Sequence, residues 1–357
     1  MNHKSQHYLW HRNEPFQCDN GSVLPYLELH YTTIGQMSSK QDNIVWIFHP
    51  LTCNSDPSEW WSDLIGPGCV IDPSHYFIIC ANVLGGCYGS LGASNKQPNS
   101  DDRYGVDFPI LTVSDMVRAH DHLRQHLGIT RIALGLGGSF GGQQLLEYLA
   151  QHPTLFDQAC AIGANAKHSG WGIAFNETQR MALEADSSFF LKTPHAGAKG
   201  LACARAIAVL SYRSKALYDE TQTDSRNEIS DDFKASQYQI HQGKKIVARF
   251  DPHVYWYLTK AMDSHNIGRK CGSIQEALRN VTTKVLLLAL KDDLLFSVSD
   301  HQVMDQYLPN STLVCLDSRH GHDSMLKESE KIAHHISLFL SINKIFSVRD
   351  IHESSTI

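Results

Sequence analysis

The run Gly137-Gly-Ser139-Phe-Gly-Gly142 constrains the fold of this chain more than any other feature. It follows the apolar run 131–136, which reads as a buried strand, and it precedes a helix predicted to start near Gly141. A serine at a sharp strand-to-helix turn has a strained backbone, and neighbouring Cβ atoms there would clash with adjacent segments. A glycine-rich turn with an incidental serine is the alternative. The flanking strand and helix favour a serine nucleophile.

Short apolar runs alternate with helix-like stretches over the first half of the chain. Residues 43–48 and 75–80 read as further buried strands, and residues 112–127 carry apolar side chains at helical spacing. Thr112 can cap that helix, with Asp115 as an imperfect capping box. The alternation of strands and helices along the chain predicts an α/β fold with a mostly parallel sheet flanked by helices.

The pattern changes between residues 168 and 280, which are mostly helix-like, most clearly at 200–210 and 250–262. Strand character returns at 285–290 and 312–316, and an amphipathic stretch over 327–340 closes the chain. We therefore expect an α/β core made of residues 1–167 and 281–357, with residues 168–280 inserted as a helical lid.

A serine hydroxyl needs a base, and the base needs an orienting carboxylate. In folds with this turn, the acid and then the histidine follow the serine in the chain, each after a later strand. Asp292 and Asp293 come directly after the 285–290 strand, and His320 and His322 follow the 312–316 strand. Spacing alone does not choose within either pair.

The tetrahedral oxyanion of such chemistry needs two backbone N–H donors. One is expected from Phe140, directly after the nucleophile, and the other from the loop His49-Pro-Leu-Thr-Cys-Asn54 after the 43–48 strand. Pro50 has no N–H, so Leu51 is the better candidate.

Overall composition excludes several other classes of function. A net charge of -6 gives no reason to expect nucleic acid as a partner, and no apolar run is long enough for a membrane span. The nine cysteines include no C-x-x-C pair, which predicts free thiols in a reducing compartment and a cytoplasmic protein. His120-Asp-His122 is a weak metal signal because residues two apart on a helix point in different directions, so no metal site is expected.

The chain resembles the homoserine O-acetyltransferase family of the α/β-hydrolase superfamily over about residues 20 to 340. The matching stretches begin with His49-Pro-Leu-Thr, Glu59-Trp-Trp, Asn82-Val-Leu-Gly-Gly-Cys-Tyr-Gly-Ser90, Tyr104-Gly-Val-Asp-Phe-Pro109, the nucleophile turn and Ala174-Phe-Asn-Glu-Thr-Gln-Arg180. They continue with Leu210-Ser-Tyr-Arg-Ser214, Tyr257-Leu-Thr-Lys-Ala-Met-Asp263, Asp293-Leu-Leu-Phe296 and Gly321-His-Asp323.

The resemblance implies Asp293 and His322 as the partners of Ser139, with Asp292 and His320 as bystanders. It further implies that Arg205, with Tyr212 nearby, holds the carboxylate of an amino acid substrate and that Asp323 takes its ammonium group.

The reaction implied by the resemblance is ping-pong transfer of an acetyl group from acetyl-CoA to L-homoserine through acyl-Ser139, in methionine biosynthesis. Acetyl-CoA is then a co-substrate, no cofactor is permanently bound, and the enzyme is a homodimer packed through its lid helices.

Several positions depart from the family pattern. The run Gly89-Ser-Leu-Gly-Ala93 is altered, Cys53 replaces a glycine, and Phe140 replaces a frequent methionine. We expect these changes near the acyl and acceptor pockets. Succinyl-CoA as donor, serine as acceptor, and a plain serine hydrolase or esterase are therefore the alternatives on the same scaffold.

Overall fold

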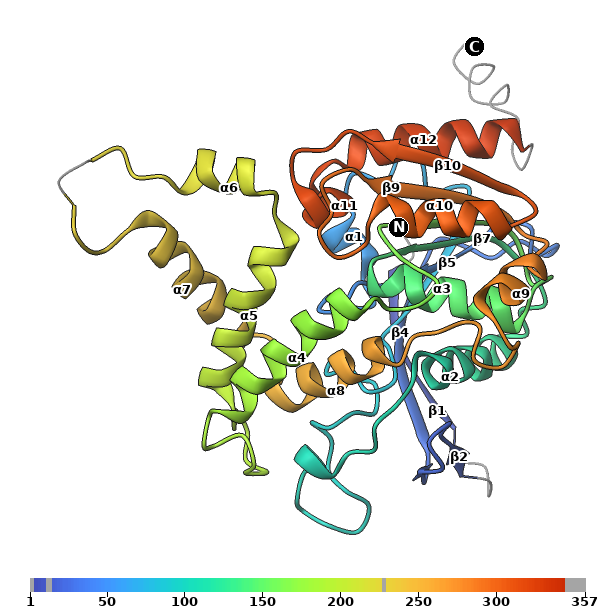
Figure 1. Ribbon diagram of the computed structural model, residues 1–357. Helices are drawn as coiled ribbons and strands as arrows, with labels where there is room; N and C mark the ends of the chain where they lie inside the picture. Colours follow the sequence, from blue (N-terminus) through green and yellow to red (C-terminus); the bar gives the residue numbers. More distant parts are fainter. Residues whose placement is uncertain (1–2, 11–14, 227–228, 344–357) are drawn as a thin grey trace.

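The computed structural model describes residues 3–10, 15–226 and 229–343. Its central feature is an eight-stranded sheet in the order β1-β4-β6-β5-β7-β8-β9-β10, with helices on both faces (Figure 1). The strands are β1 (His3–Trp10), β4 (Leu27–Ile34), β5 (Ile44–Phe48), β6 (Phe77–Ala81), β7 (Ile132–Gly138), β8 (Phe156–Ile162), β9 (Lys284–Leu290) and β10 (Ser311–Leu316). A separate hairpin joins β2 (Phe16–Gln17) to β3 (Val23–Leu24).

The sheet is mostly parallel. Only the pairs β1–β4 and β4–β6 are antiparallel, and every pair from β6 to β10 is parallel. The five strands expected from apolar runs correspond to β5, β6, β7, β9 and β10. The predicted α/β class is therefore confirmed.

Three strands of the sheet, β1, β4 and β8, were not predicted from the sequence. β1 is rich in polar residues and lies at the edge of the sheet, where backbone pairing with β4 rather than an apolar face holds it. β4 alternates in burial at its start, and Asp157 and Gln158 interrupt the apolar run of β8. Apolar periodicity is therefore too weak a signal in these three segments.

Helices cover both faces of the sheet. One face carries α2 (Val113–His126), α3 (Phe140–Gln151) and α10 (Val298–Tyr307), and the other carries α1 (Pro57–Trp60), α11 (Ser324–Lys327) and α12 (Ser329–Ile342). Short 3₁₀ turns, η1 (Gly105–Asp107) and η2 (Gly321–Asp323), complete the core. The capping box of α2 is complete, since the Thr112 hydroxyl accepts from Asp115 N–H and the Asp115 carboxylate accepts from Thr112 N–H.

The chain between β8 and β9 is helical. It forms α4 (Gly170–Glu184), α5 (Ala198–Tyr212), α6 (Lys215–Gln222), α7 (Lys234–Val247), α8 (Pro252–Asp263) and α9 (Ile274–Arg279). We call α4 to α8 the lid helices; α6 and α7 project away from the core in Figure 1. Gly200 lets α5 cross α4 closely, because a Cβ there would lie 2.6 Å from Leu183 Cα. The predicted lid, 168–280, also includes α9, which contacts α10 of the core.

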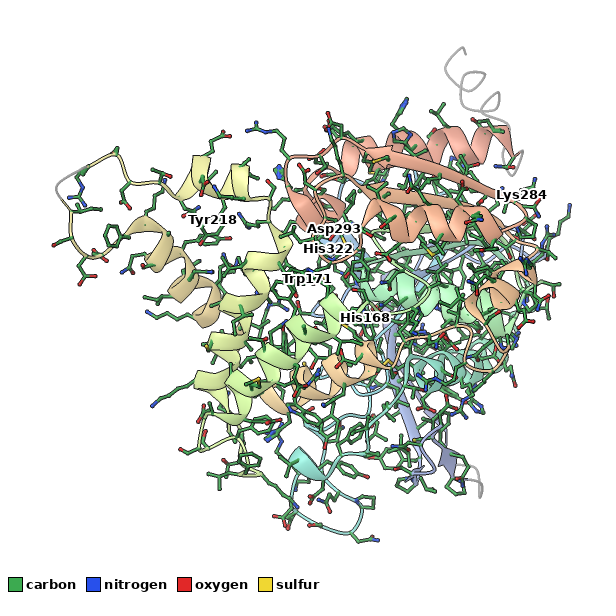
Figure 2. The ribbon with its side chains drawn as sticks, in the orientation of Figure 1. His168, Trp171, Tyr218, Lys284, Asp293 and His322 are labelled. Carbon is green, nitrogen blue, oxygen red and sulfur yellow. The ribbon has the colours of Figure 1, made fainter. Side chains whose placement is uncertain are left out.

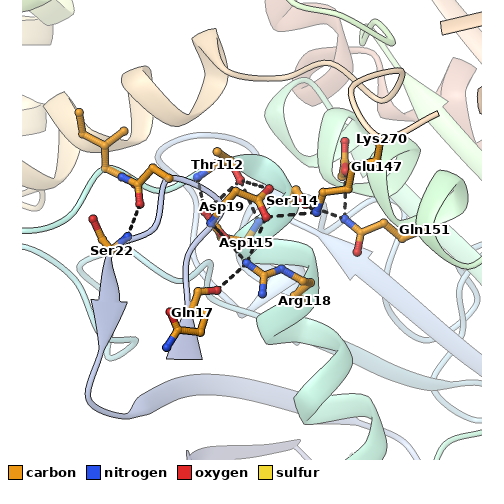
Figure 3. A network of polar contacts seen from close by, with 12 residues as sticks. Gln17, Asp19, Ser22, Thr112, Ser114, Asp115, Arg118, Glu147, Gln151 and Lys270 are labelled. Carbon is orange, nitrogen blue, oxygen red and sulfur yellow. Dashed lines mark hydrogen bonds and ion pairs between the residues drawn. The ribbon is translucent and has the colours of Figure 1, made fainter. Parts of the chain in front are cut away.

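A polar network ties the end of the lid segment to the core (Figure 3). Lys270, past the end of α8, donates to the Asp19 carboxylate at 3.1 Å and to the Ser114 hydroxyl at 2.9 Å. Asp115, which pairs with Arg118, accepts from Asp19 N–H at 2.8 Å. Three segments far apart in sequence therefore meet where the chain returns from the lid to the core.

Candidate active site

Ser139 stands at the turn between β7 and α3 with a positive φ of 56° and ψ of −125°. Its N–H donates to the Ile162 carbonyl at 2.9 Å, which fixes the turn to the neighbouring strand β8. Gly141 is required for space, because a Cβ at this position would lie 2.0 Å from the Phe48 carbonyl oxygen. Gly141 therefore allows α3 to start directly against the end of β5, and the crowding expected at this turn comes from that strand.

A hydrogen-bonded chain of three side chains runs from this serine. His322 Nε2 lies 2.8 Å from Ser139 Oγ, and His322 Nδ1 lies 2.6 Å from Asp293 Oδ2. The other Asp293 oxygen accepts from the N–H groups of Leu295 and Phe296, which hold the carboxylate in place. Asp293 and His322 lie together where the core meets the lid helices (Figure 2).

Burial and charge act in opposite directions on His322. Burial lowers the pKa of His322, but the charge and hydrogen bond of Asp293, with a smaller effect of Asp323, outweigh it and raise the pKa above the usual 6.5. An imidazole with a raised pKa is a stronger base toward a hydroxyl proton.

The tertiary structure shows which acid and which histidine of the two candidate pairs reach Ser139. Asp292 is exposed and His320 half-buried, and neither belongs to the chain of hydrogen bonds that leads to Ser139. The structure brings Asp293 and His322, and not their neighbours, to the serine.

The two backbone N–H groups expected to bind an oxyanion belong to different loops near the nucleophile. Neither Leu51 N–H nor Phe140 N–H donates a hydrogen bond within the described part of the chain. Leu51 lines the pocket that contains Ser139, and Phe140 begins α3, whose dipole places positive potential at the same point. Both groups are thus available to an oxyanion.

A small pocket lies over Ser139 between the core and the lid. Its lining includes Leu51 and Leu295 from the core and His168, Asn176 and Tyr212 from the start of the lid segment, α4 and α5. The lid helices thus form much of the wall around the serine.

The residues implied for substrate recognition gather beside this pocket. The guanidinium of Arg205 lies 5.3 Å from the centre of the Tyr212 ring, and no acidic side chain among the described residues pairs with it. Asp323 directly follows His322 and faces Arg213, with 3.4 Å between its Oδ2 and Arg213 Nε. An unpaired guanidinium and a carboxylate therefore both lie near Tyr212.

Comparison with known proteins identifies the family. A family model described as the alpha/beta hydrolase fold matches residues 44–329. The homoserine O-acetyltransferase of Cyclobacterium marinum is 42% identical over 331 residues, which cover 93% of this chain and 94% of that protein. The chain belongs to the homoserine O-acetyltransferase family of α/β hydrolases. The resemblance found in the motifs is thus confirmed.

Solved structures share the fold. The crystal structure of homoserine O-acetyltransferase from Staphylococcus aureus is 28% identical, with a TM-score of 0.79 and 95% of each chain covered. Esterase E22 reaches a TM-score of 0.85 at 20% identity, covering 95% of this chain and 100% of that one, which shows the shared fold alone.

The departures from the homoserine O-acetyltransferase family pattern fall mainly outside the pocket over Ser139. Phe140, Leu91 and Ala93 are buried in the core. Cys53 lines a smaller, adjoining pocket together with Leu51. Phe140 directly follows Ser139, but its side chain is buried in the hydrophobic core and does not line the pocket.

Sequence reasoning missed a polar network at the lid side of the pocket. His168 bonds Gln143 of α3 at 3.1 Å and Asn176 of α4 at 3.2 Å, and Asn176 donates to Asp263, the partner of the buried Arg180. Burial lowers the pKa of His168 to about 4. Asn176 and Arg180 lie in one of the family-like stretches, which was the only available signal.

Among the described residues, no group of three or more His, Cys, Asp or Glu side chains could hold a metal ion. His120 stacks on Phe48 in the core rather than facing a site. No helix within residues 3–10, 15–226 and 229–343 is long and apolar enough to cross a membrane.

Proposed function

We propose that this protein is a homoserine O-acetyltransferase, which moves an acetyl group from acetyl-CoA to the hydroxyl of L-homoserine in methionine biosynthesis. The observation that carries the proposal is the hydrogen-bonded chain Ser139–His322–Asp293 below a pocket lined by Tyr212, whose ring lies beside the unpaired guanidinium of Arg205. The names of the relatives support the same activity.

The first half-reaction acylates the enzyme. His322 Nε2 takes the proton of Ser139 Oγ as the oxygen attacks the thioester carbonyl, and the N–H groups of Leu51 and Phe140 stabilise the oxyanion. The C–S bond then breaks, and His322 returns the proton to the leaving sulfur, so that coenzyme A departs as the thiol. Acetyl-CoA is a co-substrate in this scheme, and no resident cofactor is needed.

The second half-reaction reverses these roles. Arg205 binds the carboxylate of L-homoserine, because a guanidinium fork matches a carboxylate geometrically. Asp323 accepts the ammonium group, and Tyr212 forms the wall between the two. His322 then takes the proton of the homoserine hydroxyl as it attacks the acetyl carbon, and Ser139 leaves with that proton.

Water competes with the acceptor for the acyl-enzyme. The side chains of Ser139 and His322 are almost fully buried, and His168, Asn176 and Tyr212 cover the pocket from the lid side. Exclusion of water by the lid helices favours transfer over hydrolysis.

The test is to follow the acetyl group by intact-protein mass spectrometry and thiol release. Acetyl-CoA alone should leave one acetyl group on the wild-type enzyme, and L-homoserine should then remove it as O-acetylhomoserine. A panel with succinyl-CoA and with L-serine separates the alternative donors and acceptors. Acetyl-CoA turnover at the same rate without any acceptor would identify a hydrolase. Ser139→Ala should reduce kcat on the order of 10⁶-fold.

We further propose a homodimer packed through the lid helices. Large apolar side chains are exposed there, including Leu210 of α5, Ile240 of α7 and Phe233 just before α7. Sedimentation of the wild type against Ile240→Glu would test this interface, and a monomeric wild type would reject it. All nine cysteines are free thiols, which supports a reducing compartment, and the cytoplasm stays the prediction.

A further inference from the structure

The two proposed oxyanion donors come from separate loops, so the position of one loop relative to the other must be fixed. Leu51 lies after β5, whereas Phe140 begins α3 after β7. An oxyanion hole works only if both N–H groups point at one oxygen before the reaction starts. The structure therefore has to contain contacts that fix the direction of the Leu51 N–H.

His49, two residues before Leu51, makes two hydrogen bonds to the backbone. Its Nδ1 lies 2.8 Å from the Pro50 carbonyl oxygen, and its Nε2 lies 3.1 Å from the backbone nitrogen of Val83. A carbonyl oxygen can only accept and an N–H group can only donate. The imidazole is therefore the neutral tautomer with its proton on Nδ1, and both ring nitrogens are satisfied.

The surroundings of His49 keep it in that form. The side chain is 2% exposed, and burial lowers the pKa of His49 to about 4, although the bond to Pro50 opposes this shift. The neutral imidazole cannot donate through Nε2, so it does not compete for the oxyanion or for the proton of Ser139.

We infer that His49 is a positioning residue for the oxyanion hole. The Pro50 carbonyl and the Leu51 N–H belong to one planar trans peptide, so they point in opposite directions. The Cys53 N–H also donates to that carbonyl, at 3.0 Å, from the turn that follows. The Nδ1–H of His49 adds the bond from the core side, and so turns the Leu51 N–H away from the core and toward the pocket over Ser139. The bond to Val83 anchors the imidazole to the loop that follows β6.

Gln144 supplies the matching link between the two donor loops. It is fully buried on α3, and its Nε2 donates to the Phe140 carbonyl at 3.2 Å and to the His49 carbonyl at 3.4 Å. One amide group thus contacts the backbone on both sides of the oxyanion hole. His49 sets the direction of one donor, and Gln144 keeps the two loops together.

This inference rests on the proposed function, because it assigns the oxyanion to Leu51 and Phe140. Two variants separate the hydrogen bonds of His49. The amide nitrogen of His49→Asn can replace Nδ1 and donate to the Pro50 carbonyl. The amide oxygen of His49→Gln can replace Nε2 and accept from Val83 N–H, but leaves the Pro50 carbonyl with only its bond from the Cys53 N–H.

The experiment measures the single-turnover rate of acylation by acetyl-CoA and the inhibition constant of a trifluoromethyl ketone, which forms a tetrahedral adduct with an oxyanion. We expect His49→Gln and His49→Ala to slow acylation by about 10²-fold and to raise the inhibition constant of the ketone by about 10²-fold, as for a misplaced catalytic group. His49→Asn should recover most of the loss, and the pH dependence of acylation should not move.

His253→Ala serves as the control, since His253 is also a buried histidine bonded to a backbone carbonyl, that of Phe189, at 2.6 Å within the lid segment. It should lower the melting temperature without weakening the ketone adduct. Equal acylation rates in His49→Asn and His49→Gln, or a shifted pH profile, would overturn the inference. A wild type that is never acylated would instead reject the proposed function.

Discussion

His322 Nε2 lies 2.8 Å from Ser139 Oγ, although 183 residues separate the two along the chain. Ser139 follows β7 and His322 follows β10, and β8 and β9 lie between these strands in the sheet. Because the four strands are parallel, their carboxyl ends meet at one edge, where Asp293 after β9 completes the chain of hydrogen bonds. The site therefore depends on the packing of the whole sheet.

Asp293→Asn should reduce kcat by about 10⁴-fold, because the amide no longer holds the reactive tautomer of His322. Acylation requires neutral His322 and so rises with pH through its pKa, which Asp293 raises above 6.5. Without that charge, burial dominates, and the rise should move to lower pH. Single-turnover acylation measured between about pH 5 and pH 9 checks this. A rise at the wild-type pH would show that another group acts as the base.

Arg205→Ala should raise the KM for L-homoserine by about 10- to 100-fold, because a charge-assisted hydrogen bond to the substrate is lost. Acylation by acetyl-CoA should not change, since it precedes homoserine binding. Arg131→Ala is the matched control. Arg131 pairs with Asp157 at the amino ends of β7 and β8, whereas the site lies at their carboxyl ends. An unchanged KM in the Arg205 variant would refute the carboxylate site.

Gly141→Ala should destabilise the protein by about 3 kcal/mol and reduce acylation, because the new methyl group would overlap the Phe48 carbonyl. Gly170→Ala, also at the start of a helix, has open space around the new Cβ and should be neutral or slightly stabilising. Urea unfolding of both variants measures the difference. Equal stabilities would mean that the turn can relax away from β5.

His120→Leu should make stability less sensitive to acid. Burial, with a smaller contribution from His49, lowers the pKa of His120 from 6.5 to about 3. His120 therefore binds a proton below pH 6.5 in the unfolded chain, but only below about pH 3 in the folded chain. The free energy of unfolding falls as the pH drops through this window. At pH 5 this costs the wild type about 2 kcal/mol, and near pH 7.5 almost nothing.

Unfolding free energies of wild type and His120→Leu at these two pH values measure that difference. Neither ring nitrogen of His120 has a hydrogen-bond partner within the described residues, so the substitution breaks no such bond. A variant whose gain is the same at both pH values would contradict a neutral buried His120.

Much of the site follows from short segments of the sequence. Ser139 lies in a turn whose glycines are required by contacts within a few residues, so the motif and its flanking elements identify it. Thr112 and Asp115 form a capping box across one turn, which sequence spacing also reveals. Such features depend on neighbours along the chain.

Other features depended on neighbours far away. The choice of Asp293 over Asp292 rests on which side chain faces His322, 29 residues later. β1 is a strand because β4 pairs with it, and Phe140 is a core residue because α3 packs on the sheet. The network of His168 and the hydrogen bond between His49 and Val83 join separate segments of the chain, and no local sequence pattern predicts such contacts.

The sequence by itself therefore determined the α/β class, the nucleophile turn and a short list of candidate partners, because glycine geometry, apolar runs and family-like motifs are properties of short segments. Only the tertiary structure decided which acid and which histidine reach Ser139, and that Leu51 lines the pocket over it. Directions of side chains and peptide planes are set by long-range packing, and that information exists only once the sheet and the lid have assembled.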